Sequence, residues 1–231
     1  GFEQVNINTV GNPDEVTDEL WNSYYTSISA CNTLIKIIGE NTKLSPDELS
    51  PIGGEAHFLR AFNYFQLVRW FGEVPLLTEE NQDNAAKEPQ ASVARIYEQI
   101  VSDLKNAELT LPLSQDDPSR PSRWAAKALL AKVYLTSCYA LARDKANEVI
   151  SEKVYTLEKV YPQLWLWSNR KINSEFIFAL YASSDNATGS YIHQAVRPTD
   201  HGENGWADWT SDKRFLETFP VGDGSRLSGT F

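Results

Sequence analysis

One stretch of the sequence carries apolar side chains around almost the whole circumference of a predicted helix. The segment GGEAHFLRAFNYFQLVRWFGEVPLL runs from Gly53 to Leu77. A surface helix shows a single apolar stripe, whereas a helix that is apolar on all sides has to be covered on more than one side. We therefore expect this helix to lie between neighbouring elements. Its apolar positions are Phe58, Leu59, Ala61, Phe62, Tyr64, Phe65, Leu67, Val68, Trp70 and Phe71.

The residues before this segment also predict helices. Residues 18–38 place apolar side chains at helical spacing, and a glycine follows them. Ser45 is the expected N-cap of a helix over 46–71, because a proline comes next and a glutamate occupies the capping-box position. Gly72 is expected to end this helix. Some irregularity is expected at 51–54, which contains a proline and two glycines.

A polar linker over 78–90 separates this part from further predicted helices. Ser92 is the expected N-cap of a helix over 93–111, an alanine-rich helix is expected over 119–141, and a short one over 144–153. Successive antiparallel helix pairs with small residues at their contacts are typical of a tetratricopeptide-like array. In such an array a central helix has neighbours on both sides.

The character of the sequence changes after residue 155. The side-chain pattern of residues 175–183 alternates and favours a strand. The segments that follow are rich in Gly, Asn, Asp and Pro and predict turns and long loops, with one helix at 211–218. We expect an all-α fold, a tetratricopeptide-like right-handed helical repeat scaffold with a loop-rich, partly β irregular segment. The helical core would span 1–155, and 156–231 would be the loop-rich ligand-binding segment of the same domain.

Composition excludes several functions. The formal net charge of −10 argues against nucleic acid and against a general anionic lipid surface. There is no run of about 18 uncharged apolar residues that would span a membrane as a helix. Cys31 and Cys138 could pair or stay free. The chain starts with Gly1 and contains no Met, so we expect it to be a piece of a longer protein.

The stretch from Glu55 to Leu77 resembles the hallmark motif of the SusD/RagB family of nutrient-binding outer-membrane lipoproteins. Further segments resemble family motifs in the same order, and they include IYEQIVSDLKNAELTLP and RPSRWAAKALLAKVYL. Family members are longer, so the resemblance leads us to expect that the family's C-terminal part and N-terminal lipidated cysteine lie outside this sequence. The residues that fit the hallmark are Glu55, Ala56, Phe58, Arg60, Ala61, Tyr64, Leu67, Phe71, Gly72, Glu73, Val74, Pro75 and Leu76.

The resemblance implies a function as well as a fold. It implies a lipid-anchored protein on the extracellular face of the outer membrane that binds oligosaccharide or polysaccharide without catalysis. Uptake would then proceed through a SusC-like TonB-dependent transporter. The lipid anchor would be the only link to the membrane, and no cofactor is implied.

Two tryptophans in the loop-rich segment are the leading candidates for glycan contact. Trp206 and Trp209 lie in ENGWADW, and a flat indole can stack on the apolar C–H face of a sugar ring. Asn204 and Asp208 could bond its hydroxyls, and Tyr191 could line the same cleft. In the alternative interpretation, these tryptophans anchor the loops to the helical scaffold.

Other aromatic and charged residues have structural interpretations. Trp70 and Trp124 lie on apolar helices, where a core or interface position is favoured. Arg60 and Arg69 are expected to bond inter-helix carbonyls or carboxylates, with Glu55 as one candidate partner, because a buried cation has to be paired.

Two other function classes stay open at this point. An α-helical carbohydrate-active enzyme needs two suitably spaced carboxylates, and 31 acidic residues make some such pair inevitable. A helical-repeat scaffold for peptides would show a concave groove between helices. Three His and two Cys are scattered along the chain, so we expect no tetrahedral metal site.

Overall fold

The computed structural model describes residues 15–165, 168 and 173–180. These residues belong to two compact units. The first holds 15–156 and 176–179, and the second holds 157–165, 168, 173–175 and 180. The first unit contains the long helices, and the second contains the short 3-10 helix η2 (Tyr161–Trp165).

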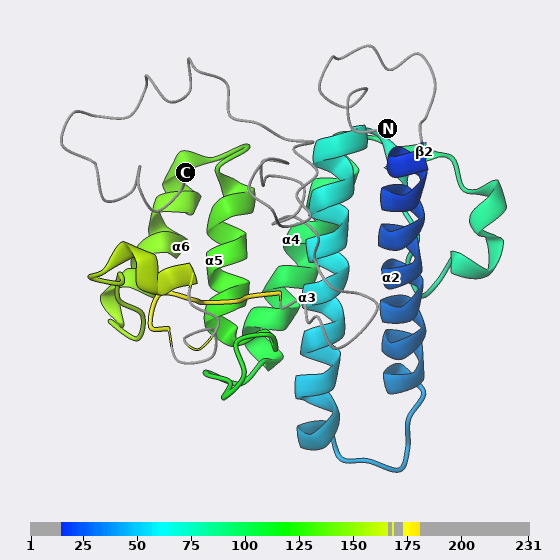
Figure 1. Ribbon diagram of the computed structural model, residues 1–231. Helices are drawn as coiled ribbons and strands as arrows, with labels where there is room; N and C mark the ends of the chain where they lie inside the picture. The colour runs from blue at the N-terminus through cyan, green and yellow to red at the C-terminus, as the bar shows by residue number, and fades with distance from the viewer. Residues whose placement is uncertain (1–14, 166–167, 169–172, 181–231) are drawn as a thin grey trace, which may run out of the picture. The chain divides into compact units, whose positions relative to one another are not determined.

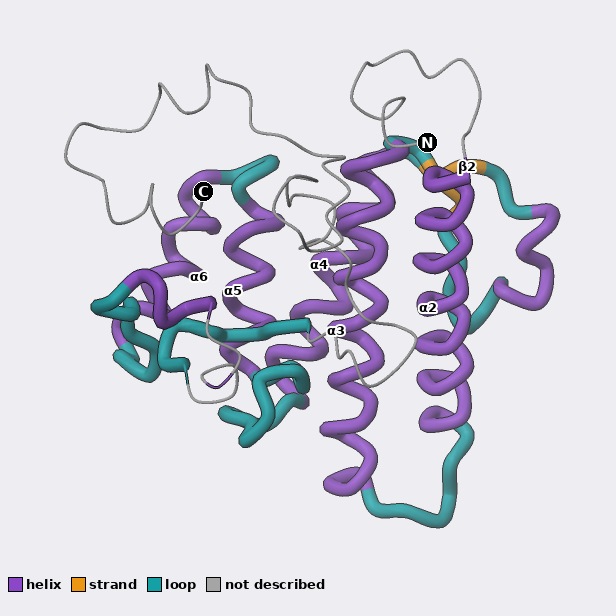
Figure 2. The backbone as a smooth tube through the Cα atoms, viewed as in Figure 1, coloured by secondary structure: helices purple, strands orange, loops and turns teal. Residues whose placement is uncertain are grey.

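The first unit is a succession of antiparallel helices with one small two-stranded sheet (Figure 1). The prediction of an all-α scaffold is therefore confirmed, as the purple helices of Figure 2 show. Within the described residues, no helix has both the length and the apolar character needed to cross a membrane. The helices are α2 (Glu15–Gly39), α3 (Pro46–Phe71), α4 (Val93–Thr110), α5 (Arg123–Tyr134) and α6 (Tyr139–Ser151).

Helix α3 is the central element, and it packs against both α2 and α4 (Figure 1). This arrangement explains its unusual sequence, because two neighbouring helices cover different sides of it. Its start is capped as expected: the Ser45 hydroxyl accepts the Glu48 N–H, and the Ser45 N–H donates to the Glu48 carboxylate at 2.9 Å. The helix passes through Pro51 without a break and ends at Gly72, which has a φ of 71°.

A close approach between helices occurs at Gly54 of α3. A Cβ atom at this position would lie 2.6 Å from Thr110 Oγ1 and 3.0 Å from Leu111 Cγ. Glycine is favoured here, because a larger residue would force the side chains of Thr110 and Leu111 to shift.

A short hairpin follows α3 and leads into α4. Strand β1 (Val74–Pro75) pairs antiparallel with β2 (Gln90–Ala91), in the register Val74 with Ala91 and Pro75 with Gln90. The chain between the strands, residues 76–89, makes an excursion that includes the 3-10 helix η1 (Gln82–Lys87). We call residues 76–89 the hairpin excursion.

The boundary between the last two helices differs from the prediction. A single helix was expected over 119–141, but α5 ends at Tyr134 and a turn over 135–138 precedes α6. The turn lets α6 fold back along α5, which buries Ala142 and Val149. Lys127 of α5 and Lys145 of α6 bond Glu148 at 2.6 and 3.1 Å. This packing is a tertiary effect, since the turn itself contains neither Gly nor Pro.

The strand predicted over 175–183 is not present at its described positions. Residues 175–180 form turns and bends instead. Phe178 packs its ring edge against Phe58 and Phe62 of α3, at centroid distances of 5.0 and 6.0 Å. The Ala179 N–H donates to the Pro118 carbonyl at 2.9 Å. Phe178 therefore covers a further part of α3, and the described part of the segment does not pair with a strand.

Candidate functional site

The residues predicted to contact a glycan lie outside the described residues. Trp206, Trp209 and Tyr191 belong to this group, and so do Asn204 and Asp208. Their assignment as a binding site therefore stays a prediction. The polar features that the structure describes lie instead around α3, α4 and the hairpin excursion.

A buried ion pair joins α3 to α4. Arg60 is 1% exposed and Asp103 is 2% exposed. The guanidinium donates two parallel hydrogen bonds to the carboxylate, from Nε to Oδ2 at 2.8 Å and from Nη2 to Oδ1 at 2.7 Å. Asp103 Oδ1 also lies 2.8 Å from His57 Nδ1 and accepts Gln99 Nε2 at 3.2 Å. The prediction that Arg60 pairs with an inter-helix carboxylate is confirmed.

The same guanidinium extends the network to α2 and to the hairpin excursion. Arg60 Nη1 donates to Asn32 Oδ1 at 2.8 Å and to the Glu79 carboxylate. Asn32 in turn donates to the Leu77 carbonyl at 3.1 Å. Glu55, which we considered as a partner of Arg60, pairs instead with Arg120 at 2.7 Å. One arginine therefore connects α2, α3, α4 and the excursion.

The charges of this network stabilise one another. Burial alone would raise the pKa of the Asp103 carboxyl, but hydrogen bonds from His57 and Arg60 outweigh it and lower that pKa. Burial would lower the pKa of Arg60, and the carboxylates of Asp103 and Glu79 raise it instead. The ion pair is consequently held in its charged form at neutral pH.

Hydrogen bonds hold the hairpin excursion in shape. The Tyr64 hydroxyl accepts the Leu77 N–H at 2.7 Å and donates to the Leu77 carbonyl at 2.8 Å. The Asn81 side chain accepts the Thr78 N–H at 2.7 Å and donates to the Leu76 carbonyl at 3.0 Å. The polar wall that the excursion presents is therefore fixed before any ligand arrives.

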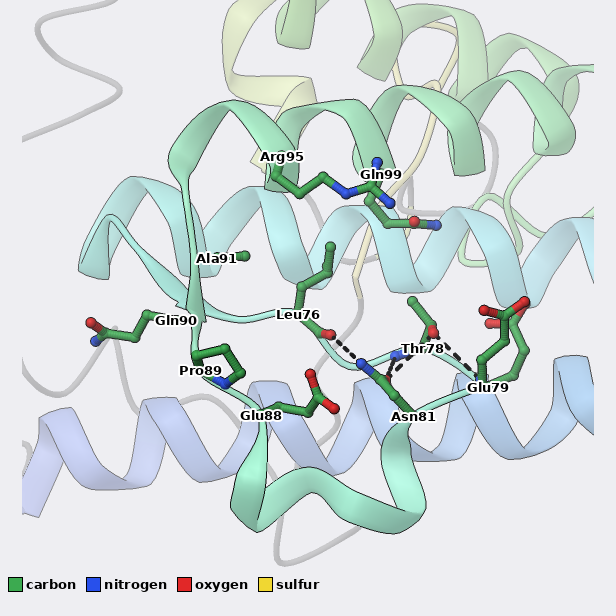
Figure 3. Close-up of a pocket in the computed structure, with 11 residues that line it drawn as sticks. Leu76, Thr78, Glu79, Asn81, Glu88, Pro89, Gln90, Ala91, Arg95 and Gln99 are labelled. Carbon is green, nitrogen blue, oxygen red and sulfur yellow. Dashed lines mark hydrogen bonds between the residues drawn. The ribbon is translucent and has the colours of Figure 1, made fainter.

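Between the excursion and the first turns of α4 lies a pocket of about 520 Å³, which we call the hairpin pocket (Figure 3). Arg95 and Gln99 extend over it from α4, and Thr78, Asn81 and Glu88 belong to the excursion (Figure 3). Its volume lies within the range of small-molecule sites. The full set of lining residues is Leu76, Thr78, Glu79, Glu80, Asn81, Glu88, Pro89, Gln90, Ala91, Arg95 and Gln99.

The chemistry of the hairpin pocket is that of recognition through hydrogen bonds. It combines carboxylates, amides, a hydroxyl and a guanidinium with a few apolar side chains. In the part of the chain that the structure describes, no three His, Cys, Asp or Glu residues are grouped in a way that could hold a metal ion. The sequence did not reveal this pocket, because 78–90 looks like an ordinary polar linker until the hairpin closes against α4.

A second depression, the α4–α5 groove, is more apolar. It measures about 920 Å³, and its walls include Tyr97 and Val101 from α4 and Val133 and Tyr134 from α5. Exposed Ser102 also lies at its edge. A groove of this kind between helices can receive apolar side chains of a peptide.

The other residues that the sequence singled out are placed as follows. Trp124 is buried in the core, as predicted, whereas Trp70 is 58% exposed, so its core interpretation is wrong and its interface interpretation stays a prediction. Arg69 is exposed and lies over the Phe65 ring at 5.2 Å, with no carboxylate or carbonyl partner among the described residues. Cys31 and Cys138 are both free thiols, and burial raises the pKa of Cys31 to about 11.

Comparison with known proteins identifies similar chains. A SusD-like protein of Bacteroides ovatus is 27% identical over 241 residues, which cover 94% of this chain and 43% of the relative. A SusD superfamily structure from Parabacteroides distasonis has a TM-score of 0.79 at 32% identity, covering 89% of this chain and 46% of that one. A structure described as a laminarin-binding SusD-like protein has a TM-score of 0.64 at 34% identity, covering 69% and 36%.

This chain thus spans less than half the length of each of these proteins. Residues 2–135 match a SusD-like protein family described as starch-binding and associating with the outer membrane. That match covers more than half of the chain and includes the central helix, its two neighbours and the hairpin between them. The chain therefore belongs to the SusD-like family.

Proposed function

We propose that this chain binds oligosaccharide or polysaccharide at the cell surface, without catalysis, for uptake through a SusC-like TonB-dependent transporter. The protein would be attached to the extracellular face of the outer membrane by a lipid anchor. Membership of a family described as starch-binding and associating with the outer membrane is the observation that carries this proposal. The similarity to a laminarin-binding protein at 34% identity supports it.

The proposed glycan contacts are in the loop-rich segment. Trp206 and Trp209 would stack on sugar rings, because the C–H faces of a pyranose are apolar and match a flat indole. Asn204 and Asp208 would bond ring hydroxyls, and Tyr191 would line the same cleft. The helices of the first unit would be the scaffold that carries this segment.

The test is a calorimetric titration of the chain with laminarin oligosaccharides, followed by a wider screen of neutral glycans. Trp206→Ala should weaken binding of the selected glycan about five- to tenfold, since stacking on an aromatic residue contributes on the order of 1–1.5 kcal/mol. Trp70→Ala is the matched control, because Trp70 is exposed on the helical scaffold and its loss should leave affinity unchanged. Binding of no saccharide at all would refute the proposal.

The same samples address the enzyme alternative. After prolonged incubation, the bound glycan should be recovered at its original length, as measured by mass spectrometry. Release of shorter products by purified protein would show that the protein hydrolyses the glycan and would contradict the proposal of binding without catalysis.

Peptide binding is the second candidate function, and the α4–α5 groove favours it. Ser102→Trp would fill this groove from an exposed position. Glycan affinity should be unaffected by this substitution if the primary proposal holds. Loss of glycan binding in Ser102→Trp with the fold intact would place the ligand in the groove. It would contradict the proposed glycan contacts of Trp206 and Trp209.

A further inference from the structure

The hairpin pocket has a charge that restricts what it can bind. Glu80 and Glu88 bring two carboxylates that have no ion-pair partner among the described residues. Glu79 shares Arg60 with Asp103, and Arg95 is paired with Glu98 at 3.0 Å. The surroundings of the pocket are therefore negative overall. An anionic ligand would be repelled, and a neutral or cationic one would be accepted.

The hydrogen-bonding groups of the pocket divide into fixed and uncommitted ones. Asn81 and Gln99 are held by bonds to Thr78, Leu76 and Asp103. The Glu88 carboxylate and the Gln90 amide make no side-chain hydrogen bond within the described part of the chain. Together they offer both donors and acceptors. A sugar hydroxyl both donates and accepts, so it can satisfy groups of both kinds at once.

Apolar atoms complete the pocket. Leu76, Pro89 and Ala91 lie along its side in Figure 3, next to the polar groups. A sugar ring has an apolar C–H face as well as hydroxyls, so it matches this combination. A bare metal cation does not match it, because the described carboxylates do not form a cluster that could ligate one.

We propose that the hairpin pocket is a second saccharide subsite that takes a neutral sugar and rejects a uronate. It is separate from the predicted glycan contacts at Trp206 and Trp209, which we call the tryptophan platform. This inference rests on the proposed function, because it assumes that the chain meets glycans. It adds a site on the helical scaffold and a charge preference. The excursion and α4 supply its walls, and the Arg60 network keeps Glu79 in place.

The test is amide chemical-shift mapping by NMR on the whole chain, with D-glucose and D-glucuronate as probes. The two sugars share a ring and differ by one carboxylate. Glucose should shift the amides of residues 78–81, 88, 90, 91 and 95–99 saturably, with a dissociation constant on the order of millimolar. Glucuronate should bind at least about fivefold more weakly at low salt, and added NaCl should reduce this difference.

Two variants of the excursion provide the matched comparison. Glu88→Ala/Gln90→Ala removes the uncommitted groups and should weaken glucose binding about tenfold. Asp83→Asn removes one exposed carboxylate from η1, away from the pocket lining, and should leave the affinity for glucose unchanged. If both variants weaken glucose binding equally, the effect comes from the loss of a negative charge anywhere on the excursion, and the proposed subsite is overturned. CaCl2 is the third probe, and pocket shifts with Ca²⁺ but not with glucose would make this a cation site and overturn the proposal.

The outcomes separate this inference from the proposed function. If laminarin oligosaccharides bind with loss in Trp206→Ala but the pocket amides do not move with any sugar, the second subsite is refuted and the platform stands. If the pocket amides move and Trp206→Ala has no effect, the subsite stands and the platform is refuted. If no sugar moves any amide, both are refuted.

Discussion

Replacement of Asp103 by asparagine is the sharpest test of how the helical scaffold is held together. The substitution keeps the shape of the side chain and turns one carboxylate oxygen into a donor. Oδ1 receives Arg60 Nη2, His57 Nδ1 and Gln99 Nε2, whereas Oδ2 receives only Arg60 Nε. The amide oxygen would therefore take the Oδ1 position, and the NH2 group would face the Nε–H of Arg60.

The cost follows from these contacts. One charge-assisted hydrogen bond is lost, which is about 1.5–3 kcal/mol, and a donor then faces a donor in a buried site. Breaking a buried ion pair costs about 3–5 kcal/mol, and Glu79 and Asn32 still hold the guanidinium, so the lower end applies. We expect a loss of about 3 kcal/mol, equivalent to a fall in Tm of about 6–12 °C for a chain of this size.

Urea unfolding followed by circular dichroism measures this loss, because the helices dominate the signal. Glu98→Gln is the control on the same helix, since its carboxylate is exposed and bonds only exposed Arg95. That control should cost less than about 0.5 kcal/mol. A loss below about 1 kcal/mol for Asp103→Asn, with an unchanged m-value, would refute the conclusion that this ion pair is a principal link between α3 and α4.

Further predictions concern acid, packing and the excursion. Because the folded pKa of Asp103 is lowered from its ordinary 3.8, its contribution is complete above that pH and is lost as pH falls through the lowered value. The stability difference between wild type and Asp103→Asn should thus shrink as pH falls below 3.8, as urea titrations at several pH values would show. Gly54→Ala should cost about 1–3 kcal/mol through overpacking against Thr110 and Leu111, and a Tm equal to wild type would contradict the close helix contact. Tyr64→Phe should cost about 1–3 kcal/mol, because the Leu77 N–H loses its hydroxyl partner; hydrogen exchange at that amide should accelerate, and unchanged protection would argue against the bond.

Local sequence signals were sufficient for most of the helical scaffold. The capping box at Ser45, the glycine at the end of α3 and the Ser92 cap of α4 each act within a few residues, so their geometry can be deduced from the sequence. The apolar circumference of α3 likewise required neighbours on more than one side, whatever those neighbours were. The chemical type of the partner of Arg60 also followed from the sequence, because a buried cation needs a paired group.

Contacts between distant residues decided the rest. The turn over 135–138 exists because α6 gains burial and the Lys127–Glu148 ion pair by folding back on α5, and nothing within the turn encodes that gain. The described residues 175–180 form no strand, since Phe178 packs on α3 and the Ala179 N–H donates to the Pro118 carbonyl. Asp103 lies 43 residues from Arg60 and became its partner through helix packing, while Glu55, only five positions away, pairs elsewhere. The hairpin pocket has the same origin: its lining residues are spread over residues 76–99, and only the closure of the hairpin against α4 gathers them.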